Sequence, residues 1–173
     1  MVANVSNDQK KPAVPIILSS PVHVLIVIAK FYHDIAEELL QGALACLKQN
    51  KTSYDLLEVP GAFEIPAAIH MALAAIDYKS NQLKQKIEGS IALGCVIRGE
   101  TSHYDYVCGE SARGLQQIAC QQLHPVGNGI LTVENKNQAW DRAKRNKQNK
   151  GGEAASACLS MIMTKRRLFQ DKK

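Results

Sequence analysis

The sequence predicts an α/β protein in which helices cover both faces of a parallel sheet. Strand-like segments begin near residues 22, 53, 90 and 129, and a helical pattern follows each of them. Such alternation is typical of βαβ units, in which a crossover helix joins two parallel strands. The first and third segments are almost purely aliphatic, as strands buried on both faces are. We therefore expect a three-layer α/β/α sandwich around a four-stranded parallel sheet.

The length and composition fit one domain of this kind. The chain has 173 residues, of which 46% are hydrophobic and 21% charged, enough for a sizeable core. No apolar run reaches the roughly 18 residues that a membrane-spanning helix needs. The polar N-terminus lacks the apolar centre of a secretory signal. We expect an extended N-terminal arm at residues 1–20, a single domain at residues 21–173, and a cytoplasmic location.

The cysteine pattern argues against a disulfide framework and against a zinc site. The cysteines are odd in number, scattered and never spaced as C-x-x-C. We expect them to be small, buried and reduced. The chain also lacks the glycine-rich fingerprints of dinucleotide and nucleoside triphosphate sites. The sequence thus predicts neither a metal nor a cofactor. The five cysteines are Cys46, Cys95, Cys108, Cys120 and Cys158, of which Cys108 is the one to check for reactivity because His103 is close.

The basic charge of the chain is local. The formal net charge is +5, and residues 136–150 and 165–173 carry much of the excess. A basic tail is one signal of nucleic-acid binding. However, only 5% of the residues are aromatic, and no RNA-binding or helix-turn-helix motif is present. We expect that these basic residues form a solvated face, and the second interpretation is that they attract an anionic small-molecule substrate. We expect no nucleic-acid or membrane partner.

The domain is expected to begin with a buried strand and an amphipathic helix. Residues 22–29 are nearly all aliphatic and predict the strand. Asp34 and Glu37 have the spacing of a capping box, and apolar residues recur at helical spacing behind them. We therefore expect a helix from Asp34 to about residue 50.

A second strand and a closely packed helix follow. Residues 53–59 have the length and weak alternation of a strand, which the breaker pair Pro60-Gly61 ends. Pro66, a favoured first residue of a helix, opens an alanine-rich segment that reaches residue 78. His70, in the middle of that helix, is expected to be an ordinary core or surface residue.

The third strand is expected at residues 91–97, after a polar loop, and its helix at residues 104–123. Residues 125–129 are interpreted as a turn before a short fourth strand at residues 130–133. A helix is then expected from residue 134 to about 147. Gly151-Gly152 should separate it from a last helix, residues 153–169, whose basic end suits the helix dipole.

Three strand ends should meet at one edge of this sheet, because parallel strands all point their carboxyl ends the same way. That edge would collect Phe31, then residues 62–64, then residues 98–103. Two aromatic rings beside the Glu64 carboxylate suit a flat, polar heterocycle. The alternative is that Phe31 and Phe63 are core residues.

The segment from Arg98 to His103 carries the groups best suited to chemistry. Gly99–Ser102 precedes a helix and offers backbone N–H groups and the positive helix end to a phosphate. Glu100 would repel a phosphate, so we expect its side chain to face away. His103 is the natural general acid/base, because imidazole titrates near neutrality. Arg98 could bind a ligand or form a structural ion pair.

Three motifs resemble one known family. They are VPGAFEIP at 59–66, GCVIRGETSHYDYV at 94–107 and GILTVENKNQAWDRA at 129–143. They resemble 6,7-dimethyl-8-ribityllumazine synthase, the transferase of the penultimate step of riboflavin biosynthesis, and the resemblance runs in order from Val22 to Phe169. It implies a flavodoxin-like fold with sheet order 2-1-3-4. It also implies condensation of 5-amino-6-(D-ribitylamino)uracil with 3,4-dihydroxy-2-butanone 4-phosphate, releasing phosphate and water.

The resemblance also implies roles for residues, carried over by position. His103 would transfer protons, and Phe31 would stack on the pyrimidine. The phosphate would be bound by backbone N–H groups of Glu100 and Thr101 and by Arg142 of a neighbouring subunit. Lys150 and Glu153 would approach the same subunit interface, with Glu153 orienting His103. The uracil and ribityl groups would also contact Ala62, Phe63, Glu64, Cys95, Val96 and Ile97, the last three through their backbone.

Two features of the sequence depart from the family pattern. Many members carry an aromatic residue where this chain has Asn128, which would replace stacking with a hydrogen bond to the uracil. Residues 142–152 lack the Gly-Ala-Gly run associated with members that form icosahedral shells. We therefore expect a homopentamer, with an icosahedral shell as the alternative and riboflavin synthase as a possible partner.

A relative that binds riboflavin or a lumazine without turnover is the competing function. The presence of His103, Arg142 and Gly99–Thr101 favours the enzyme.

Overall fold

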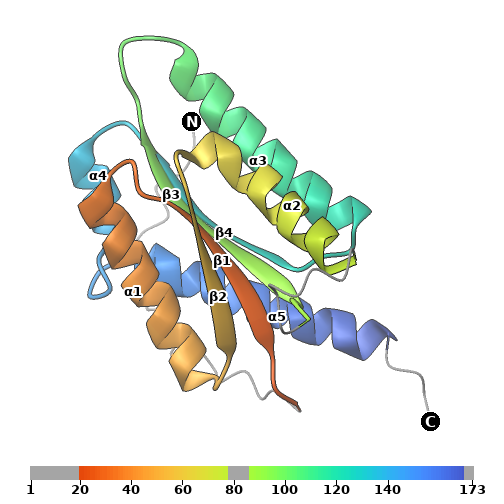
Figure 1. The fold of residues 1–173 in the computed structure, drawn as a ribbon. Coiled ribbons are helices and arrows are strands. Elements are labelled where there is room, and N and C mark those ends of the chain that lie inside the picture. Colours follow the sequence, from red (N-terminus) through yellow and green to blue (C-terminus); the bar gives the residue numbers. More distant parts are fainter. Residues whose placement is uncertain (1–19, 78–85, 170–173) are drawn as a thin grey trace.

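Four parallel strands form one sheet in the order β2-β1-β3-β4 in the computed structural model, which describes residues 20–77 and 86–169 (Figure 1). The expected fold class and strand order are confirmed. The expected N-terminal arm lies almost wholly outside the described residues. The strands are β1 (His23–Ala29), β2 (Ser53–Val59), β3 (Gly89–Ile97) and β4 (Val126–Val133).

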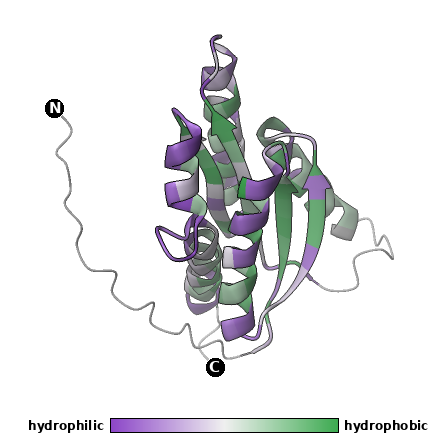
Figure 2. Cartoon of the chain, turned by 90° about the vertical axis from the view of Figure 1, so that its left-hand side faces the viewer, coloured by the Kyte–Doolittle hydropathy of each residue, from purple (hydrophilic) through white to green (hydrophobic). Residues whose placement is uncertain are grey.

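Helices cover the sheet on both faces. On one face lie α1 (His33–Gln49), α4 (Lys136–Ala143) and α5 (Lys150–Phe169) (Figure 1). On the other lie α2 (Ile65–Asp77), α3 (His103–Gln121) and the short 3₁₀ helix η1 (Ala62–Glu64). Apolar strands therefore lie between amphipathic helices whose outer faces are polar (Figure 2).

The central strand β1 supplies both cores by simple alternation. Its even residues, Val24, Ile26 and Ile28, pack in the core with α1 and α5. Its odd residues, Leu25, Val27 and Ala29, pack in the core with α2 and α3. All six are at most 2% exposed, which explains why this strand reads as one aliphatic run rather than as alternating apolar and polar residues.

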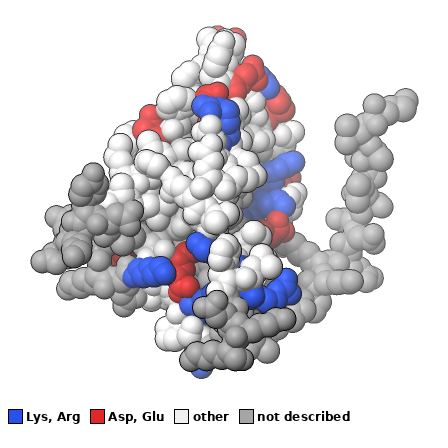
Figure 3. Space-filling model, turned by 90° about the vertical axis from the view of Figure 1, so that its right-hand side faces the viewer, with Lys and Arg blue, Asp and Glu red and all other residues white. Residues whose placement is uncertain are grey.

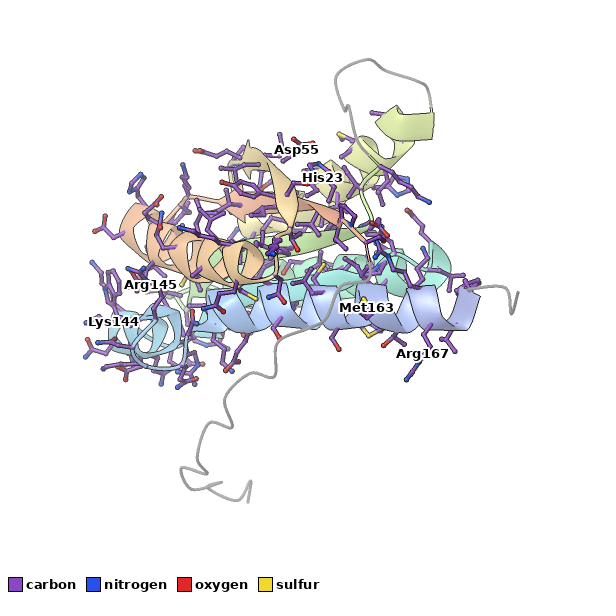
Figure 4. All side chains as sticks on the ribbon, turned by 90° about the horizontal axis from the view of Figure 1, so that it is seen from below. His23, Asp55, Lys144, Arg145, Met163 and Arg167 are labelled. Atoms are coloured by element: carbon purple, nitrogen blue, oxygen red, sulfur yellow. The ribbon has the colours of Figure 1, made fainter. Side chains whose placement is uncertain are left out.

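The amino-terminal ends of β1 and β2 are joined by side chains as well as by the backbone. The His23 side chain lies beside Asp55 of β2 (Figure 4). Its Nδ1 is 2.8 Å from the Ser53 hydroxyl, and its Nε2 is 3.0 Å from a carboxylate oxygen of Asp55.

The expected capping box at the start of α1 is wrong. The helix begins one residue earlier, at His33, and its N-cap residue Tyr32 makes no side-chain cap. Asp34 therefore lies in the first turn, where its carboxylate suits the positive end of the helix dipole. Glu37 instead accepts a hydrogen bond from the Gln41 amide at 2.8 Å.

Two glycine-based predictions near the C-terminus are wrong for one physical reason, which is the close packing of α5. β4 begins at Val126, within the expected turn, and α5 runs without a break through Gly151-Gly152. A Cβ on Gly127 would lie 2.0 Å from the Ala154 carbonyl oxygen, and one on Gly151 would lie 1.9 Å from the Leu39 carbonyl oxygen. These glycines permit backbone contact between elements and do not mark loops.

The helix expected to reach residue 147 is also shorter. α4 ends at Ala143, where Lys144 and Arg145 begin a turn (Figure 4). The Lys144 carbonyl accepts hydrogen bonds from the backbone N–H groups of Lys147 and Asn149. Arg145 fixes this turn to α1, because its backbone N–H and its Nε both donate to Glu38, at 3.0 and 3.2 Å.

The cysteines are all free, but they are not all buried. Cys95 and Cys158 are buried, Cys46 and Cys108 are half-buried, and Cys120 is exposed on α3, which corrects the expectation for that residue. Within residues 20–77 and 86–169, no helix is long and apolar enough to cross a membrane.

A substitution at Gly151 tests the close packing of α5. We expect Gly151→Ala to lower the free energy of unfolding by about 1–3 kcal/mol, because the added methyl group overlaps the Leu39 carbonyl. The matched control is Gly109→Ala on α3, where a Cβ meets nothing within 4 Å. That control should be neutral or stabilising by about 1 kcal/mol. Urea denaturation of both variants makes the comparison, and equal effects would contradict it.

Buried His124 predicts a loss of stability in acid. Its ring is 6% exposed and its Nε2 lies 2.8 Å from the Ser90 hydroxyl. Burial, aided by the positive charge of Lys165, lowers the pKa of His124 to about 4 from its ordinary 6.5. The unfolded chain thus binds this proton more readily, and stability is lost as the pH falls from about 6.5 towards 4.

We expect His124→Gln to remove about 2 kcal/mol of the stability difference between pH 7 and pH 4.5. Glutamine places an uncharged nitrogen near the position of Nε2 and does not titrate. The measurement is urea denaturation of the parent and the variant at both pH values. An unchanged pH dependence in the variant would show that other groups cause the acid sensitivity.

Candidate functional site

The carboxyl-terminal ends of β1, β2 and β3 surround a cavity of about 590 Å³. It lies between the segments that follow β1 and β2, the last residues of β3, and the first turn of α3. This is the sheet edge at which the sequence predicts a ligand site. The expected site residues that line it are Phe31, Ala62, Phe63, Glu64, Cys95, Val96, Ile97, Thr101 and His103.

The two aromatic residues at this edge are not core residues. Phe31 is 74% exposed and Phe63 is 53% exposed. The Phe31 ring meets the Tyr32 ring edge to face, with the centroids 5.0 Å apart, which steadies it beside the cavity. The open faces of Phe31 and Phe63 are therefore available to a flat ligand.

The last residues of β3 form a mostly apolar part of the cavity wall. Cys95 is buried, and Val96 and Ile97 are half-buried. Burial, with a smaller effect of the nearby Cys108 thiol, raises the pKa of Cys95 to about 12. Burial also raises the pKa of Cys108. Both thiols are therefore protonated at neutral pH, which excludes them as thiolate nucleophiles.

The loop between β3 and α3 presents an uncapped helix end. Ser102 is the N-cap residue, yet its side chain makes no cap hydrogen bond. Among the described residues, the one side-chain acceptor for a backbone N–H at this end is the Thr101 hydroxyl, which lies 3.4 Å from the His103 nitrogen. All residues from Gly99 to His103 are exposed. Backbone N–H groups at such a helix end favour an anion.

Glu100 does not line the cavity, whereas its neighbours Gly99 and Thr101 do. A carboxylate at this position thus stays outside the wall that an anion would approach.

Arg98 binds other side chains of the same chain. Its Nε donates to Glu134 at 3.0 Å and its Nη1 to Asp105 at 3.1 Å. Its guanidinium carbon lies 4.0 Å from the centre of the Tyr104 ring. Arg98 does not line the cavity, so of the two roles left open by the sequence the structure shows the ion pair.

Four expected site residues lie on other parts of the subunit. Asn128 is exposed on the edge strand β4, where its Oδ1 accepts a hydrogen bond from the Ile130 N–H at 3.0 Å. Arg142 lies on α4 and donates to the Gln138 carbonyl at 3.2 Å. Lys150 and Glu153 pair with each other on α5 at 2.5 Å. The structure brings none of these four into the wall of the cavity formed by the described residues.

The sequence argument missed several lining residues, chiefly Tyr32, Tyr104 and Val107. Helical spacing could have found Val107, because it lies four residues after His103 on the same face of α3. Burial and a hydrogen bond to Cys108 raise the pKa of Tyr104, so its phenol stays protonated at neutral pH. Within the described parts of the chain, no group of three or more His, Cys, Asp or Glu residues could hold a metal ion.

Comparison with known proteins identifies the family. The sequence model of 6,7-dimethyl-8-ribityllumazine synthase matches residues 21–166. A protein of that name from Agrobacterium fabrum is 50% identical over 151 residues, which cover 87% of this chain and 99% of that protein. 6,7-Dimethyl-8-ribityllumazine synthase 1 from Rhizobium meliloti is 51% identical over 152 residues, 88% of this chain and 97% of its own length. The protein of the same name from Bartonella tribocorum is 50% identical over 145 residues, which cover 84% of this chain and 91% of that protein. The chain therefore belongs to the 6,7-dimethyl-8-ribityllumazine synthase family.

Proposed function

We propose that the cavity at the carboxyl-terminal edge of the sheet is where this chain condenses 5-amino-6-(D-ribitylamino)uracil with 3,4-dihydroxy-2-butanone 4-phosphate. The product is 6,7-dimethyl-8-ribityllumazine, and the chain is an enzyme of riboflavin biosynthesis. The observation that carries the location is that Phe31, Phe63 and His103, from three separate segments, line one cavity.

The aromatic half of the cavity suits the uracil substrate. Phe31 stacks on the pyrimidine, and residues 62–64 contact the uracil and ribityl groups. The exposed faces of both phenylalanines support this assignment. Backbone groups of residues 95–97 line the same wall, where apolar side chains exclude water from the reacting atoms.

The loop half of the cavity suits the phosphate substrate. Backbone N–H groups of Glu100 and Thr101, at the uncapped start of α3, bind the phosphate dianion. The position of Glu100 outside the cavity wall supports this arrangement, because its carboxylate does not oppose the anion.

His103 moves the protons of the reaction. The amine of the uracil attacks the ketone, and loss of water gives an imine. Phosphate then leaves, and ring closure with loss of a second water completes the lumazine. Each step needs a proton taken from or given to nitrogen or oxygen near the cavity wall, and the two ring nitrogens of an imidazole can accept and donate one.

The site is completed by a second copy of the chain. Asn128 and Arg142 lie on the β4–α4 side of the subunit, away from the wall formed by the described residues, so they serve the cavity of a neighbour. A homopentameric ring places every β4–α4 side next to an adjacent cavity. In that ring Arg142 reaches the phosphate, Asn128 reaches the uracil, and Lys150 and Glu153 support the interface.

The surface of the subunit is consistent with such an assembly. The edge strand β2 exposes three large apolar or aromatic residues, Tyr54, Leu56 and Leu57, by 39–47%. An exposed edge strand with apolar side chains is usually covered by another protein surface. The side of the molecule with α2 and α3 shows a broad uncharged area (Figure 3). Met71 on α2 and Tyr106 on α3 are 68% and 67% exposed.

Turnover with both substrates tests the reaction and separates the enzyme from a non-catalytic binder. We expect lumazine absorbance and phosphate release to rise together above the uncatalysed background. His103→Ala should lower kcat by roughly 10²–10⁴-fold if His103 transfers a proton in the slow step. The control is His70→Ala, an exposed histidine on α2 that does not line this cavity. A loss below tenfold for His103→Ala would assign it to positioning.

Subunit mixing tests the shared site. His103→Ala and Arg142→Ala should each be nearly inactive alone. After the two are unfolded and reassembled together in equal amounts, about a quarter of the sites regain both residues, because His103 and Arg142 of one site come from different chains. Activity that stays at the level of the separate variants would show that both residues act within one chain.

A further inference from the structure

The Arg98 guanidinium contacts three other side chains. One edge donates to Glu134 through Nε at 3.0 Å, and the other donates to Asp105 through Nη1 at 3.1 Å. Its face covers the Tyr104 ring at 4.0 Å. The Arg98 backbone is fixed too, because its N–H donates to the Val133 carbonyl at 2.9 Å and extends the pairing of β3 with β4. Arg98 is therefore the last fixed point before the chain leaves the sheet.

The Arg98 side chain closes a ring of eight residues, from Arg98 to Asp105. The chain leaves the sheet at Arg98, passes through Gly99–Ser102 and His103, and meets the Arg98 guanidinium again at Asp105. Tyr104 and Asp105, which Arg98 holds, directly follow His103 in the first turn of α3. The loop that presents the uncapped helix end is thus tied at both of its ends to one side chain.

The loop has few other restraints among the described residues. Gly99 through His103 are exposed, and a Cβ at Gly99 would meet nothing within 4 Å. Two hydrogen bonds lie near the loop's helical end: the His103 N–H donates to the Thr101 hydroxyl at 3.4 Å, and the Asp105 N–H donates to the Ser102 carbonyl at 3.0 Å. Ordering such a segment when a ligand binds costs conformational entropy, and a cross-link that orders it beforehand removes that cost.

The second edge of Arg98 extends the restraint to α4. Glu134 directly follows β4, and its N–H donates to the Gln138 side chain at 3.0 Å. The N–H of Gln138 in turn donates to Asn135, the N-cap residue of α4. Arg98 therefore joins the β3–α3 loop to the helix that carries Arg142.

We propose that Arg98 is a positioning residue that holds the Gly99–His103 loop in the geometry that binds phosphate, without touching the substrate. This inference rests on the proposed assignment of that loop to the phosphate substrate. The role requires a planar fork with two donating edges and a stacking face, which arginine has and lysine lacks.

The test compares Arg98→Gln and Arg98→Lys with a matched control, Arg113→Gln. Arg113 forms an exposed ion pair with Glu110 further along α3, so the control removes the same charge and one pair from the same helix. We expect Arg98→Gln to raise KM for the phosphate substrate by roughly 10- to 100-fold and to lower kcat. KM for the uracil substrate should stay within about twofold, since the aromatic wall is untouched. Arg98→Lys should recover only part of the loss, and Arg113→Gln should match the parent.

Inorganic phosphate gives a readout that does not depend on turnover. Its binding, followed by NMR titration, should weaken in Arg98→Gln by a similar factor and remain unchanged in Arg113→Gln. If the parent forms no lumazine, the proposed reaction fails, while the titration still decides the role of Arg98.

Two further variants keep the inference open to refutation if Arg98→Gln does not fold. Asp105→Asn and Glu134→Gln each release one edge of the guanidinium and leave the arginine in place. Weaker phosphate binding in Asp105→Asn, with uracil KM unchanged, supports the ring closure. Equal KM increases for both substrates, unchanged phosphate binding in Asp105→Asn, or full activity in Arg98→Lys would overturn it.

Discussion

The parallel pairing of β1 on both of its edges is the constraint on which the rest of the structure depends. β1 pairs with β2 from His23 to Ala29 and with β3 from Val24 to Ile28. Because both pairings are parallel, the segments that follow three strands emerge at one edge of the sheet and form one cavity. The same strand anchors helices on both faces through its alternating residues. A shift of one residue would exchange those faces and separate Phe31 from its partners in the cavity.

The two halves of the site are built in different ways. The aromatic half follows directly from buried strands, so the sheet determines where its rings lie. The loop half projects beyond the sheet, and its shape depends on side-chain hydrogen bonds at its ends. This division matches the chemistry: a rigid heterocycle needs a slot of fixed width, whereas a phosphate needs several backbone N–H groups that converge on a point. Neither half includes Arg142, so one chain alone holds a cavity without a cation in its described wall.

Much of this could be predicted from the sequence, because hydrophobic periodicity and the parallel-edge rule are local signals. The sequence predicts β2 to the residue, and the parallel-edge rule predicts six of the expected site residues that line the cavity. The other three, Cys95, Val96 and Ile97, were expected only from the family resemblance. The start of β4 and the continuity of α5 could not be predicted, since glycine marks a turn in one setting and a close contact in another. The partners of Arg98 were hidden for a related reason: Glu134 lies 36 residues away in the chain. The roles proposed for Asn128 and Arg142 involve a second copy of the chain, whose position the periodicity of one sequence does not predict.

The close packing of α5 also orders the events of synthesis. α5 supplies Ala154, Ala155, Cys158, Leu159 and Ile162 to one of the two cores, and it follows every other described element in the chain. While α5 is still inside the ribosome, the β3–β4 surface that it covers has only α1 and α4 to shield it. The emerging chain therefore leaves an apolar sheet face uncovered until α5 is released, and in this interval the sheet is most exposed to aggregation or to a chaperone.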